Sequence, residues 1–518
     1  MIDIDRAVCK SFPSKLSFEA KMTGFISLQL HTPNAAQGIG SADKQLARSP
    51  FRESPMPQTS QPSGLVLKNM FLQEPQKTTS IETAHRRIAT ALPVPESVES
   101  LKAAADVYPH VNCYPVPVVW DRAEGYQVAD KYGNRWIDFS STAVMCNTGH
   151  GHPAIRSAVE DFARTGLLAQ FSFASDIRLE LAQRLLELAP DSCEKVYFWT
   201  VGSEAIESAF RLAREYGIRK RPGKYHILTH SGDYHGWTLG AHQLSGKADK
   251  PWLASRDQNI HFLPFPMQIG QTDEADWAEF FDRNVSALSN EVDADDVAAI
   301  FIETLQGWGA LPLPVEYMQR LRAWADEHEV LVIFDEVQTG FGRTGKWFAH
   351  EHYGVRADLI CIGKGVTSTL PLAAVLGPAA VLDVLSPGEI TTTHAAHPLS
   401  CVAALANLEV LEDESLIDEA TRKQSIIESE LASLSSRFPN HIKATSGLGM
   451  VHAIHLAGEA DTANQLARDL TWECVKRGLM LFFTGRPTIK VCPPLMIPDD
   501  ALVEGIGAIG EALQALTA

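Results

Sequence analysis

Residues 330–374, VLVIFDEVQTGFGRTGKWFAHEHYGVRADLICIGKGVTSTLPLAA, decide the fold of this chain. Two short apolar runs, LVIFDEV and DLICIGK, lie between helical patterns and indicate buried parallel strands. Asp335 stands near the end of the first run, and Lys364 ends the second. Because ligands of open parallel sheets bind just beyond the carboxyl ends of the strands, we expect both side chains to project into one crevice.

An acid and a lysine in one crevice suit a pyridinium cofactor that is held as a Schiff base. The lysine forms the imine, and the carboxylate keeps the ring nitrogen protonated so that the ring can take up electrons. The alternative is that Asp335 caps a helix and Lys364 is a solvated loop lysine, which would be the favoured interpretation of isolated residues. The longer pattern around them favours the catalytic interpretation.

The stretch resembles the signature of the class III (subgroup II) aminotransferases. The family pattern is Asp-Glu-Val-x-x-Gly-x-x-Arg-x-Gly, a spacer, and Asp-apolar-apolar-x-x-Gly-Lys, and the matching residues are Asp335-Glu336-Val337, Gly340, Arg343, Gly345, Asp358 and Gly363-Lys364. The resemblance extends from about Trp120 to Pro498. It implies an α/β chain of the PLP-dependent transferase fold type I, with a large domain on a mostly parallel, doubly wound sheet and a small α+β domain. It also implies pyridoxal 5'-phosphate (PLP) as the cofactor.

Four segments are expected along the chain. They are an N-terminal extension, partly disordered with a helical segment (1–100), the N-terminal part of the small domain (101–160), the large PLP-binding domain (161–385) and the C-terminal small domain (386–518). Residues 1 to about 80 are rich in Ser, Pro, Gln and Thr and can bury little apolar surface. From about Ser80 to Leu101 the pattern is helical, interrupted by Pro93 and Pro95. Near the end, GIGAIG (505–510) fits a dinucleotide motif, but too little chain follows, so we predict part of a final helix.

Composition and charge narrow the class of protein. The chain is 45% hydrophobic and 21% charged, as is usual for soluble globular proteins, and its net charge of −18 argues against a nucleic-acid partner. The eight cysteines form no CxxC pair, so neither a zinc site nor a disulfide framework is indicated. No apolar run is long enough to cross a membrane, and MIDIDRAVCK lacks the apolar core of a secretory signal. We predict a cytoplasmic protein.

A phosphate site is expected where a strand (195–201) leads into an amphipathic helix (204–217) that ends at a glycine. Gly202 and Ser203 stand between them and would expose backbone N–H groups at the positive end of the helix dipole, which is an anion site. In the family, the corresponding turn cups the cofactor phosphate.

Other cofactor contacts are implied by the resemblance. Tyr234-His235-Gly236 matches an aromatic-His-Gly motif whose aromatic ring stacks on the pyridine face, with Val337 on the other face. Gln338 would bond the ring oxygen. Glu303, at the end of an apolar run (297–309), matches Glu-Pro-x-Gln-Gly, although Thr304 replaces the proline.

Thr393, five residues before Pro398, corresponds to a threonine that reaches the phosphate of the neighbouring subunit's cofactor. The resemblance therefore implies a homodimer with shared active sites, and it leaves open whether dimers pair into tetramers. His394 and His397 depart from the family's usual Phe-Gly-Gly-Asn. In NTGHGHP (147–153), His150 and His152 lack an acidic or cysteine partner at ligand spacing, so we predict turn residues and no metal.

The substrate pocket is where the sequence departs from the family's 4-aminobutyrate enzymes. Trp237 and Trp308 stand where those enzymes carry an arginine and a glutamate, and Lys490 stands where an arginine grips the α-carboxylate. Lysine offers a point charge instead of a planar fork. Met145, with Ala143 and Val144 before it, would line the entrance.

We therefore expect a ping-pong aminotransferase that moves an amino group from an amine or ω-amino compound with an apolar part to a keto acid. Lys490 or Arg486 could hold the keto-acid acceptor. The alternatives are a 4-aminobutyrate-type aminotransferase, or an amino-acid racemase or decarboxylating transaminase on the same scaffold. A transcription regulator with an aminotransferase-like domain would need a basic helix-turn-helix, which the N-terminal tail does not resemble.

Overall fold

The computed structural model describes residues 69–109, 116–171, 173–246, 251–253, 255–267, 269 and 276–518. They belong to one compact unit, Leu67–Ala518. Disorder was predicted for part of the N-terminal extension, and residues 1–68 of that extension lie outside the described residues. No helix in the described part of the chain is both long and apolar enough to span a membrane.

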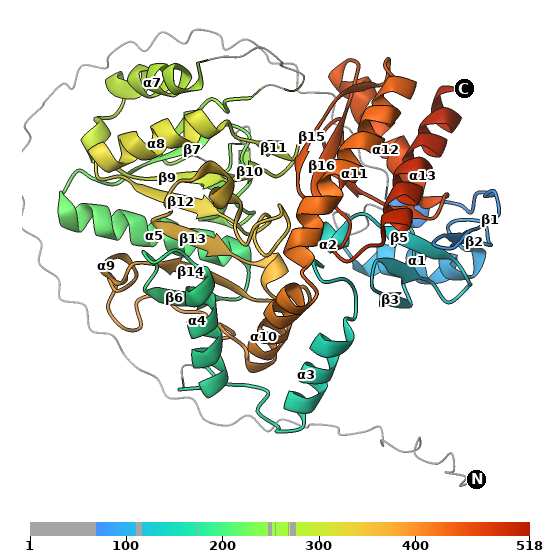
Figure 1. Ribbon diagram of the computed structural model, residues 1–518, viewed down its shortest axis with the longest axis horizontal. Coiled ribbons are helices and arrows are strands. Elements are labelled where there is room, and N and C mark those ends of the chain that lie inside the picture. The colour runs from blue at the N-terminus through green and yellow to red at the C-terminus, as the bar shows by residue number, and fades with distance from the viewer. Residues whose placement is uncertain are drawn as a thin grey trace, which may run out of the picture. The chain divides into compact units, whose positions relative to one another are not determined.

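A seven-stranded sheet forms the middle of the larger part of the molecule, on the left in Figure 1. The strands follow the order β6 (Lys195–Trp199), β14 (Ala373–Gly377), β13 (Leu359–Ile362), β12 (Leu331–Asp335), β9 (Val297–Glu303), β7 (His226–His230) and β8 (Ile260–Leu263). β14 runs antiparallel to both of its neighbours, and the other pairs are parallel. The predicted mostly parallel sheet is confirmed, and its one reversed strand, β14, follows Lys364 in the chain.

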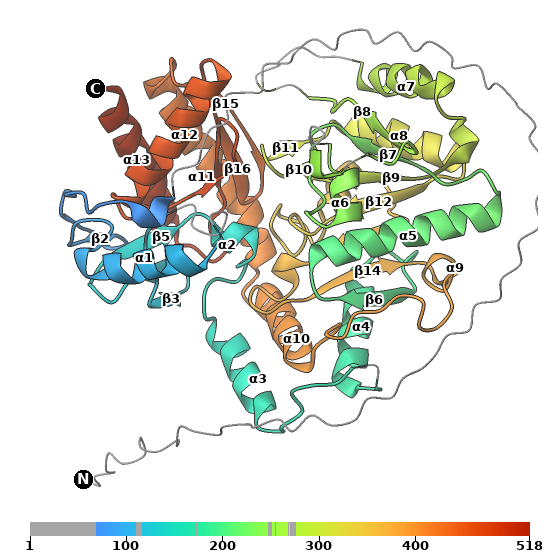
Figure 2. The ribbon, with the colours of Figure 1, turned by 180° about the vertical axis from the view of Figure 1, so that it is seen from behind.

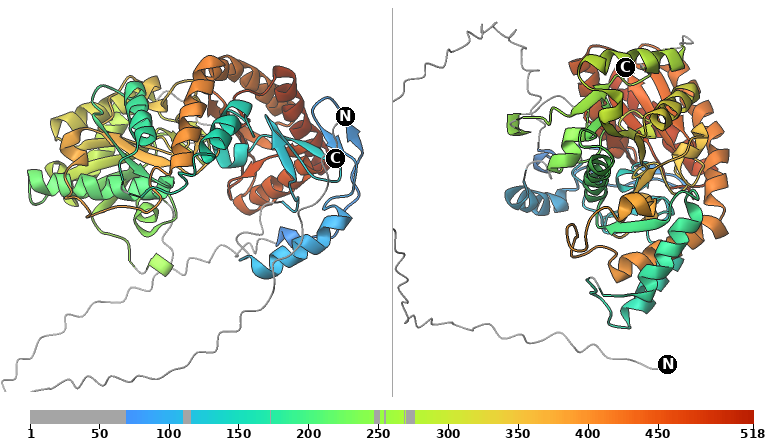
Figure 3. Two further views of the ribbon diagram at one scale, coloured as in Figure 1. Left: turned by 90° about the horizontal axis from the view of Figure 1, so that it is seen from below. Right: turned by 90° about the vertical axis from the view of Figure 1, so that its left-hand side faces the viewer.

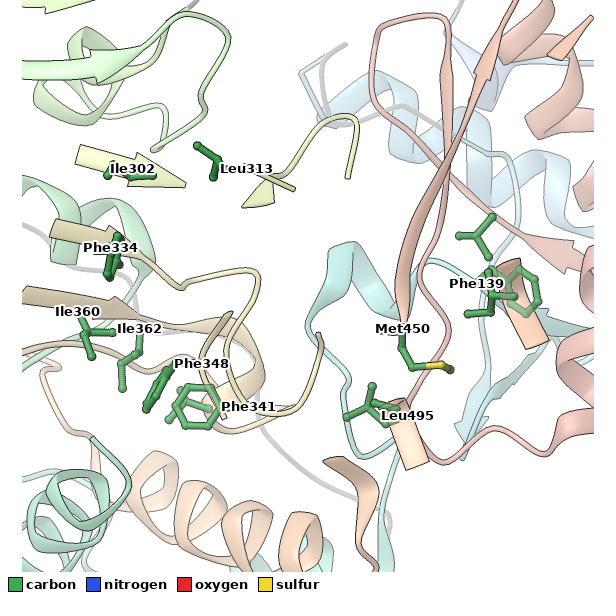
Figure 4. Close-up of a cluster of buried hydrophobic side chains, with 14 of the residues drawn as sticks. Phe139, Ile302, Leu313, Phe334, Phe341, Phe348, Ile360, Ile362, Met450 and Leu495 are labelled. Carbon is green, nitrogen blue, oxygen red and sulfur yellow. The ribbon is translucent and has the colours of Figure 1, made fainter. Parts of the chain in front are cut away.

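Both faces of this sheet are buried, because alternate residues of each strand enter different hydrophobic clusters. Phe301 and Ile333 belong to the cluster on one face, and Ile300 and Phe334 to the cluster on the other. Figure 4 shows part of the second cluster, with Phe334 on β12 near Ile360 on β13. Apolar side chains on both faces explain why these strands appear in the sequence as nearly continuous apolar runs.

Helices cover the two faces in the doubly wound manner. α5 (Gly202–Lys220) lies along one face (Figure 2) and buries Ile206, Ala209 and Leu212 in its cluster. The other cluster contains residues of α4 (Asp176–Leu188), α7 (Trp277–Ala287), α8 (Val315–Glu327) and α10 (Pro398–Asp413). The prediction that α5 ends at Gly217 is wrong. A side chain there would meet the carbonyl oxygen of Lys224 at 2.2 Å, so this glycine permits close packing and does not end the helix.

The C-terminal part forms a smaller α/β layer, coloured orange to red in Figure 1. Its antiparallel sheet contains β15 (Ile442–Leu448), β16 (Val451–Leu456), β19 (Thr488–Val491) and β18 (Phe482–Phe483), together with the helices α11 (Leu416–Arg437), α12 (Ala460–Val475) and α13 (Asp499–Thr517). The glycine-rich motif at 505–510 lies inside α13, as predicted. A Cβ atom on Gly505 would lie 2.2 Å from the Phe139 ring, so this glycine lets the helix approach that ring.

The N-terminal part of the described chain lies beside the C-terminal helices (Figure 3). Its sheet holds β1 (Ile81–Glu82), β2 (Arg87–Ile88), β5 (Arg135–Asp138), β4 (Gln127–Ala129) and β3 (Arg122–Glu124), and β17 (Leu479–Met480) pairs with β5. β4 and β5 are antiparallel and form a hairpin whose turn contains Gly133. The prediction of a helix from about Ser80 is wrong, because the helix α1 (Val98–Val107) begins only after Pro95. Hydrogen bonds from the N–H groups of Ala89 and Thr90 to Asn134 hold the preceding segment away from helical geometry.

Short elements complete the fold. They are α2 (Ser141–Val144), α3 (Pro153–Ala163), α6 (Leu239–Leu244), α9 (Ala379–Leu382), the small hairpin of β10 (Leu305–Gln306) and β11 (Leu311–Pro312), and the 3-10 helices η1 (Met70–Leu72), η2 (Pro95–Ser97), η4 (Pro251–Leu253), η5 (Leu288–Asn290), η6 (Ala294–Asp296), η7 (Ala349–Tyr353) and η8 (Lys364–Val366).

Candidate active site

A cavity of about 560 Å³ lies at the carboxyl ends of the parallel strands β7, β9, β12 and β13. We call the part around Lys364, Asp335 and Glu303 its cofactor end, and the part around Trp237, Trp308, Arg486 and Lys490 its substrate end. The predicted site residues that line the cavity are Met145, Gly202, Ser203, Tyr234, His235, Trp237, Glu303, Trp308, Asp335, Val337, Gln338, Lys364 and Lys490. One continuous cavity therefore collects side chains from widely separated parts of the sequence.

Asp335 and Lys364, the two residues predicted at the strand ends, both face this cavity. Asp335 is held in place on both oxygens: Oδ1 accepts a hydrogen bond from the Val337 N–H at 3.0 Å, and Oδ2 lies 2.8 Å from Nδ1 of His235. Burial lowers the pKa of the Lys364 ammonium, against the opposing charges of Asp335 and Glu303. A lowered pKa increases the fraction of Lys364 that is present as the neutral, nucleophilic amine.

The turn from β6 into α5 offers an anion site. The first N–H groups of a helix have no acceptor inside the helix, and α5 begins at Gly202, so Gly202 and Ser203 present theirs at the cavity wall. A Cβ atom on Gly202 would lie 2.7 Å from Cγ1 of Val337, so only glycine fits at this approach. The Glu204 carboxylate accepts hydrogen bonds from the N–H groups of Thr200 and Val201 and fixes the turn.

Tyr234 and Val337 both border the cofactor end, where the sequence predicted the two walls of a slot for a flat ring. Glu303 braces the Tyr234 segment, because its carboxylate accepts hydrogen bonds from the N–H groups of Tyr234 at 2.6 Å and Gly307 at 2.9 Å. Burial, followed by the charge of Asp233, raises the pKa of Glu303. Gln338 accepts a hydrogen bond from Lys490 on its oxygen, which leaves its amide nitrogen to donate elsewhere. Its predicted bond to the ring oxygen stays a prediction.

The substrate end is built from aromatic rings and two cations. Trp237 is 62% exposed and meets Tyr234 edge-on, with ring centroids 5.6 Å apart. The guanidinium carbon of Arg486 lies 4.0 Å from the centroid of a Trp308 ring, and Trp308 donates its indole N–H to Oε1 of Gln306 at 2.7 Å. Lys490 is only 1% exposed, and its ammonium donates to Gln338 at 2.8 Å.

The entrance wall at Ala143, Val144 and Met145 follows an unusual turn. Every residue from Ser141 to Val144 has a positive φ angle, and Ser141 donates its hydroxyl to the carbonyl of Cys492 at 2.6 Å.

His150, from the neighbouring NTGHGHP turn, lies 2.8 Å from Asp138, and the carboxylate partner of His152 is Glu414 at 3.0 Å. Among the described residues, no group of three His, Cys, Asp or Glu side chains could hold a metal ion.

Thr393 is exposed and does not border the cavity. Its predicted role concerns the cofactor of a neighbouring subunit, so it stays a prediction.

Sequence reasoning missed two neighbours of the site. Asp233, two residues before His235 in the turn after β7, is fully buried behind the cofactor end. Arg343 appeared only as a motif residue, yet its buried guanidinium donates to the carbonyls of Met450 and Pro493 and to Asn147. It therefore ties the signature stretch to the small domain.

These residues fit PLP. The cavity supplies an amine for the aldehyde, an acid for the ring nitrogen, two walls for a flat ring and free N–H groups at a helix start for a phosphate. Glycine at position 202 lets Val337 pack against the start of α5, so that the side chain of Val337 and the first N–H groups of this helix border the same cavity.

Comparison with known proteins agrees with this chemistry. The family model "Aminotransferase class-III" matches residues 108–513. The chain is 35% identical over 409 residues to the 4-aminobutyrate aminotransferase GabT of Escherichia coli, covering 76% of this chain and 93% of that protein. It is 31% identical over 409 residues to a leucine/methionine racemase of Thermococcus litoralis, covering 77% and 90%.

In structure, the chain is similar to a transaminase from the marine bacterium Virgibacillus. The TM-score is 0.72 at 24% identity, and the match covers 81% of this chain and all of that one. This likeness shows the shared fold, and the family match spans most of the sequence. The chain belongs to the class III aminotransferases, PLP-dependent enzymes of fold type I.

Proposed function

We propose that this aminotransferase takes its amino group from an amine or ω-amino compound with a substantial apolar part and gives it to a keto acid. The observation that carries the proposal is the substrate end of the cavity, where indole rings line the wall and the buried lysine is already bonded to Gln338. An apolar wall favours an apolar substituent, because burying it removes hydrocarbon surface from water.

The residues of the cofactor end have separate tasks in the reaction. PLP, when bound, supplies an electron sink that stabilises the carbanion formed at the substrate carbon. Lys364 is the base that takes the proton from the amine-bearing carbon and returns it on the cofactor side, and its lowered pKa suits that task. Asp335 would hold the proton at the ring nitrogen of bound PLP. Gly202 and Ser203 would bind its phosphate, and Tyr234 and Val337 would border the two faces of its ring.

Arg486, in preference to Lys490, would hold the carboxylate of the keto acid. Lys490 is almost fully buried and its ammonium is bonded to Gln338, so it would have to give up that hydrogen bond to reach a substrate. Arg486 borders the cavity, and its guanidinium stacks on Trp308, which fixes the plane of its donors without using them. A stacked guanidinium can still grip a carboxylate with two hydrogen bonds.

The assembly is also part of the proposal. A homodimer in the cytoplasm would bring Thr393 of one chain to the phosphate of the other. Its exposure here leaves it available for such a contact. We keep the predicted domain limits, at residues 160/161 and 385/386, as part of the same proposal.

The test separates transfer from the isomerisation that related racemases carry out. The purified holoenzyme is incubated with a keto acid and, in turn, with aliphatic and aromatic primary amines, 4-aminobutyrate, and single enantiomers of leucine and methionine. The proposal predicts one keto acid consumed for each apolar amine converted. Inversion of an enantiomer without keto-acid consumption would assign a racemase instead. Transfer from 4-aminobutyrate with none from the apolar amines would overturn the substrate proposal.

A further inference from the structure

A buried network of charged groups extends from the cofactor end of the cavity into the protein. At its centre is the ring of His235, which borders the cavity but is only 3% exposed. Nδ1 of this ring lies 2.8 Å from the carboxylate of Asp335. The protonation of His235 therefore determines what charge lies next to Asp335.

The other ring nitrogen, Nε2, has two oxygen neighbours. Oγ1 of Thr229 lies at 3.4 Å, and Oδ2 of Asp233 lies at 3.8 Å. The hydroxyl of Thr229 also lies 3.2 Å from the carbonyl of Leu244, which can only accept, and when its single proton is donated there the oxygen of Thr229 offers lone pairs to Nε2. Both nitrogens of the ring thus face acceptors. A neutral imidazole has only one N–H to donate, and its other nitrogen would point a lone pair at oxygen.

Asp233 is itself completely buried and needs compensation for its charge. Its Oδ1 accepts a hydrogen bond from Gln306 at 2.7 Å, and its Oδ2 accepts one from the Glu303 N–H at 3.4 Å. Two histidine rings flank the same oxygen, because Nδ1 of His230 also lies 3.7 Å away. Nε2 of His230 is bonded to the hydroxyl of Tyr317, so the network continues away from the cavity.

We propose that the charge of Asp233 holds His235 as a doubly protonated imidazolium, with Thr229 only a second acceptor beside Nε2, and that Asp233 is thereby a positioning residue that sets the charge next to Asp335. The inference rests on the proposed role of Asp335 at the ring nitrogen. Asp233 touches neither the cavity nor the cofactor and acts through His235.

The surrounding charges support this assignment. Burial alone would lower the pKa of His235, but the hydrogen bond that its ring donates to Asp335 and the charges of Asp335, Asp233 and Glu303 outweigh burial and raise the pKa. A positive ring also offsets the repulsion among three buried carboxyl groups, Asp233, Glu303 and Asp335.

The experiment compares the holoenzyme with Asp233→Asn by ¹⁵N NMR of histidine-labelled protein, with His235→Gln used to assign the ring signals. The amide of asparagine can turn its N–H toward Nε2, so the ring no longer needs a second proton. We expect both nitrogens of His235 to be protonated in the wild-type enzyme near neutral pH. In Asp233→Asn the signal of Nε2 should become that of an unprotonated nitrogen, as the ring returns toward its ordinary pKa of about 6.5.

The protonation of His235 in the wild-type enzyme tests the inference even if Asp233→Asn folds poorly, and two companion variants show whether the effect is specific to Asp233. Thr229→Val removes the oxygen acceptor but leaves Asp233, so the ring should stay positive. Ser245→Ala removes the hydroxyl that accepts the backbone N–H of His235 and leaves both ring contacts, so it controls for a general loss of stability. A neutral ring in the wild-type enzyme, or an unchanged ring in Asp233→Asn, would overturn the inference.

The visible spectrum of the bound cofactor gives a second readout. In Asp233→Asn the spectrum should become dependent on pH between about 5.5 and 7.5, where the released ring titrates. We expect kcat to fall on the order of ten- to a hundredfold with KM little changed, as for other residues that act through a ligand-holding side chain. If Asp335→Ala leaves the spectrum unaltered, the role of Asp335 fails, whereas the NMR result on His235 stands by itself.

Discussion

The cofactor end of the cavity is formed by side chains at the ends of β9, β12 and β13, whereas the substrate end is formed by side chains from loops and from β19 of the small domain. At the cofactor end, Asp335 and Glu303 each accept backbone hydrogen bonds that fix them. At the substrate end, Trp237 is more than half exposed and Arg486 is held by stacking. The chemistry is thus fixed by the sheet, while substrate choice depends on side chains that a few substitutions can replace.

Replacing the lysine of the cofactor end should have the largest effect. Lys364→Ala removes both the nucleophile and the base, so the rate of transfer should fall by more than about 10⁴-fold. The visible band of covalently attached cofactor should disappear as well. Both are measured on purified protein after cofactor is added, with Lys346→Ala as a matched control, since Lys346 does not border the cavity. Retained activity in Lys364→Ala would contradict the assignment.

At the substrate end, Arg486→Met should selectively weaken the binding of the keto acid. Loss of a charge-assisted hydrogen bond of about 1.5–3 kcal/mol raises its KM roughly 10- to 150-fold. The amine half-reaction, followed by stopped-flow absorbance, should change little. Lys490→Met is the comparison: it releases Gln338 and should lower kcat more than it raises KM. The opposite pattern would place the carboxylate at Lys490.

Trp308→Ala should produce a smaller change of the same kind. The variant removes the ring on which Arg486 stacks, worth about 0.5–2 kcal/mol, so the KM of the keto acid should rise between twofold and thirtyfold. Trp308→Phe keeps a ring but loses the indole N–H bonded to Gln306. Its KM for the keto acid should therefore lie between those of Trp308→Ala and the wild type. Equal KM values in all three proteins would mean that stacking does not orient Arg486.

The smallest expected effect concerns the stability of the turns that form the entrance wall. The hydrogen bond with Asp138 overcomes the burial of His150 and raises the pKa of His150 to about 10. This stabilisation is present in full below the ordinary histidine pKa of about 6.5 and is lost as the pH rises through about 10. Asp138→Asn should therefore lower the melting temperature most near pH 6. A difference that does not shrink toward pH 10 would contradict this origin.

Much of the cofactor end could be predicted from the sequence because strand ends leave a local signal. Buried strands appear as apolar runs, and the next polar residue, as with Asp335 and Lys364, lies at the carboxyl edge of the sheet. The glycines at 505–510 were assigned to a helix because no strand and no βαβ unit could surround them. These inferences needed only the neighbouring residues.

Features that depend on distant contacts could not be predicted. The segment before Pro93 has a helical pattern, yet Asn134, far along the chain, holds it extended. Asp233 looks like an ordinary turn residue until the fold brings His235, Gln306 and His230 around it. The stacking of Arg486 on Trp308 joins two parts of the chain that no periodic pattern relates.

The most direct test of the contrast between the two ends is a single-turnover absorption measurement on the purified holoenzyme without oxygen. One equivalent of an apolar amine, or of 4-aminobutyrate, is added and the visible band of the bound cofactor is followed. The account predicts that apolar amines abolish the band and that 4-aminobutyrate does so slowly or not at all. Rapid loss of the band with 4-aminobutyrate, and none with apolar amines, would contradict it.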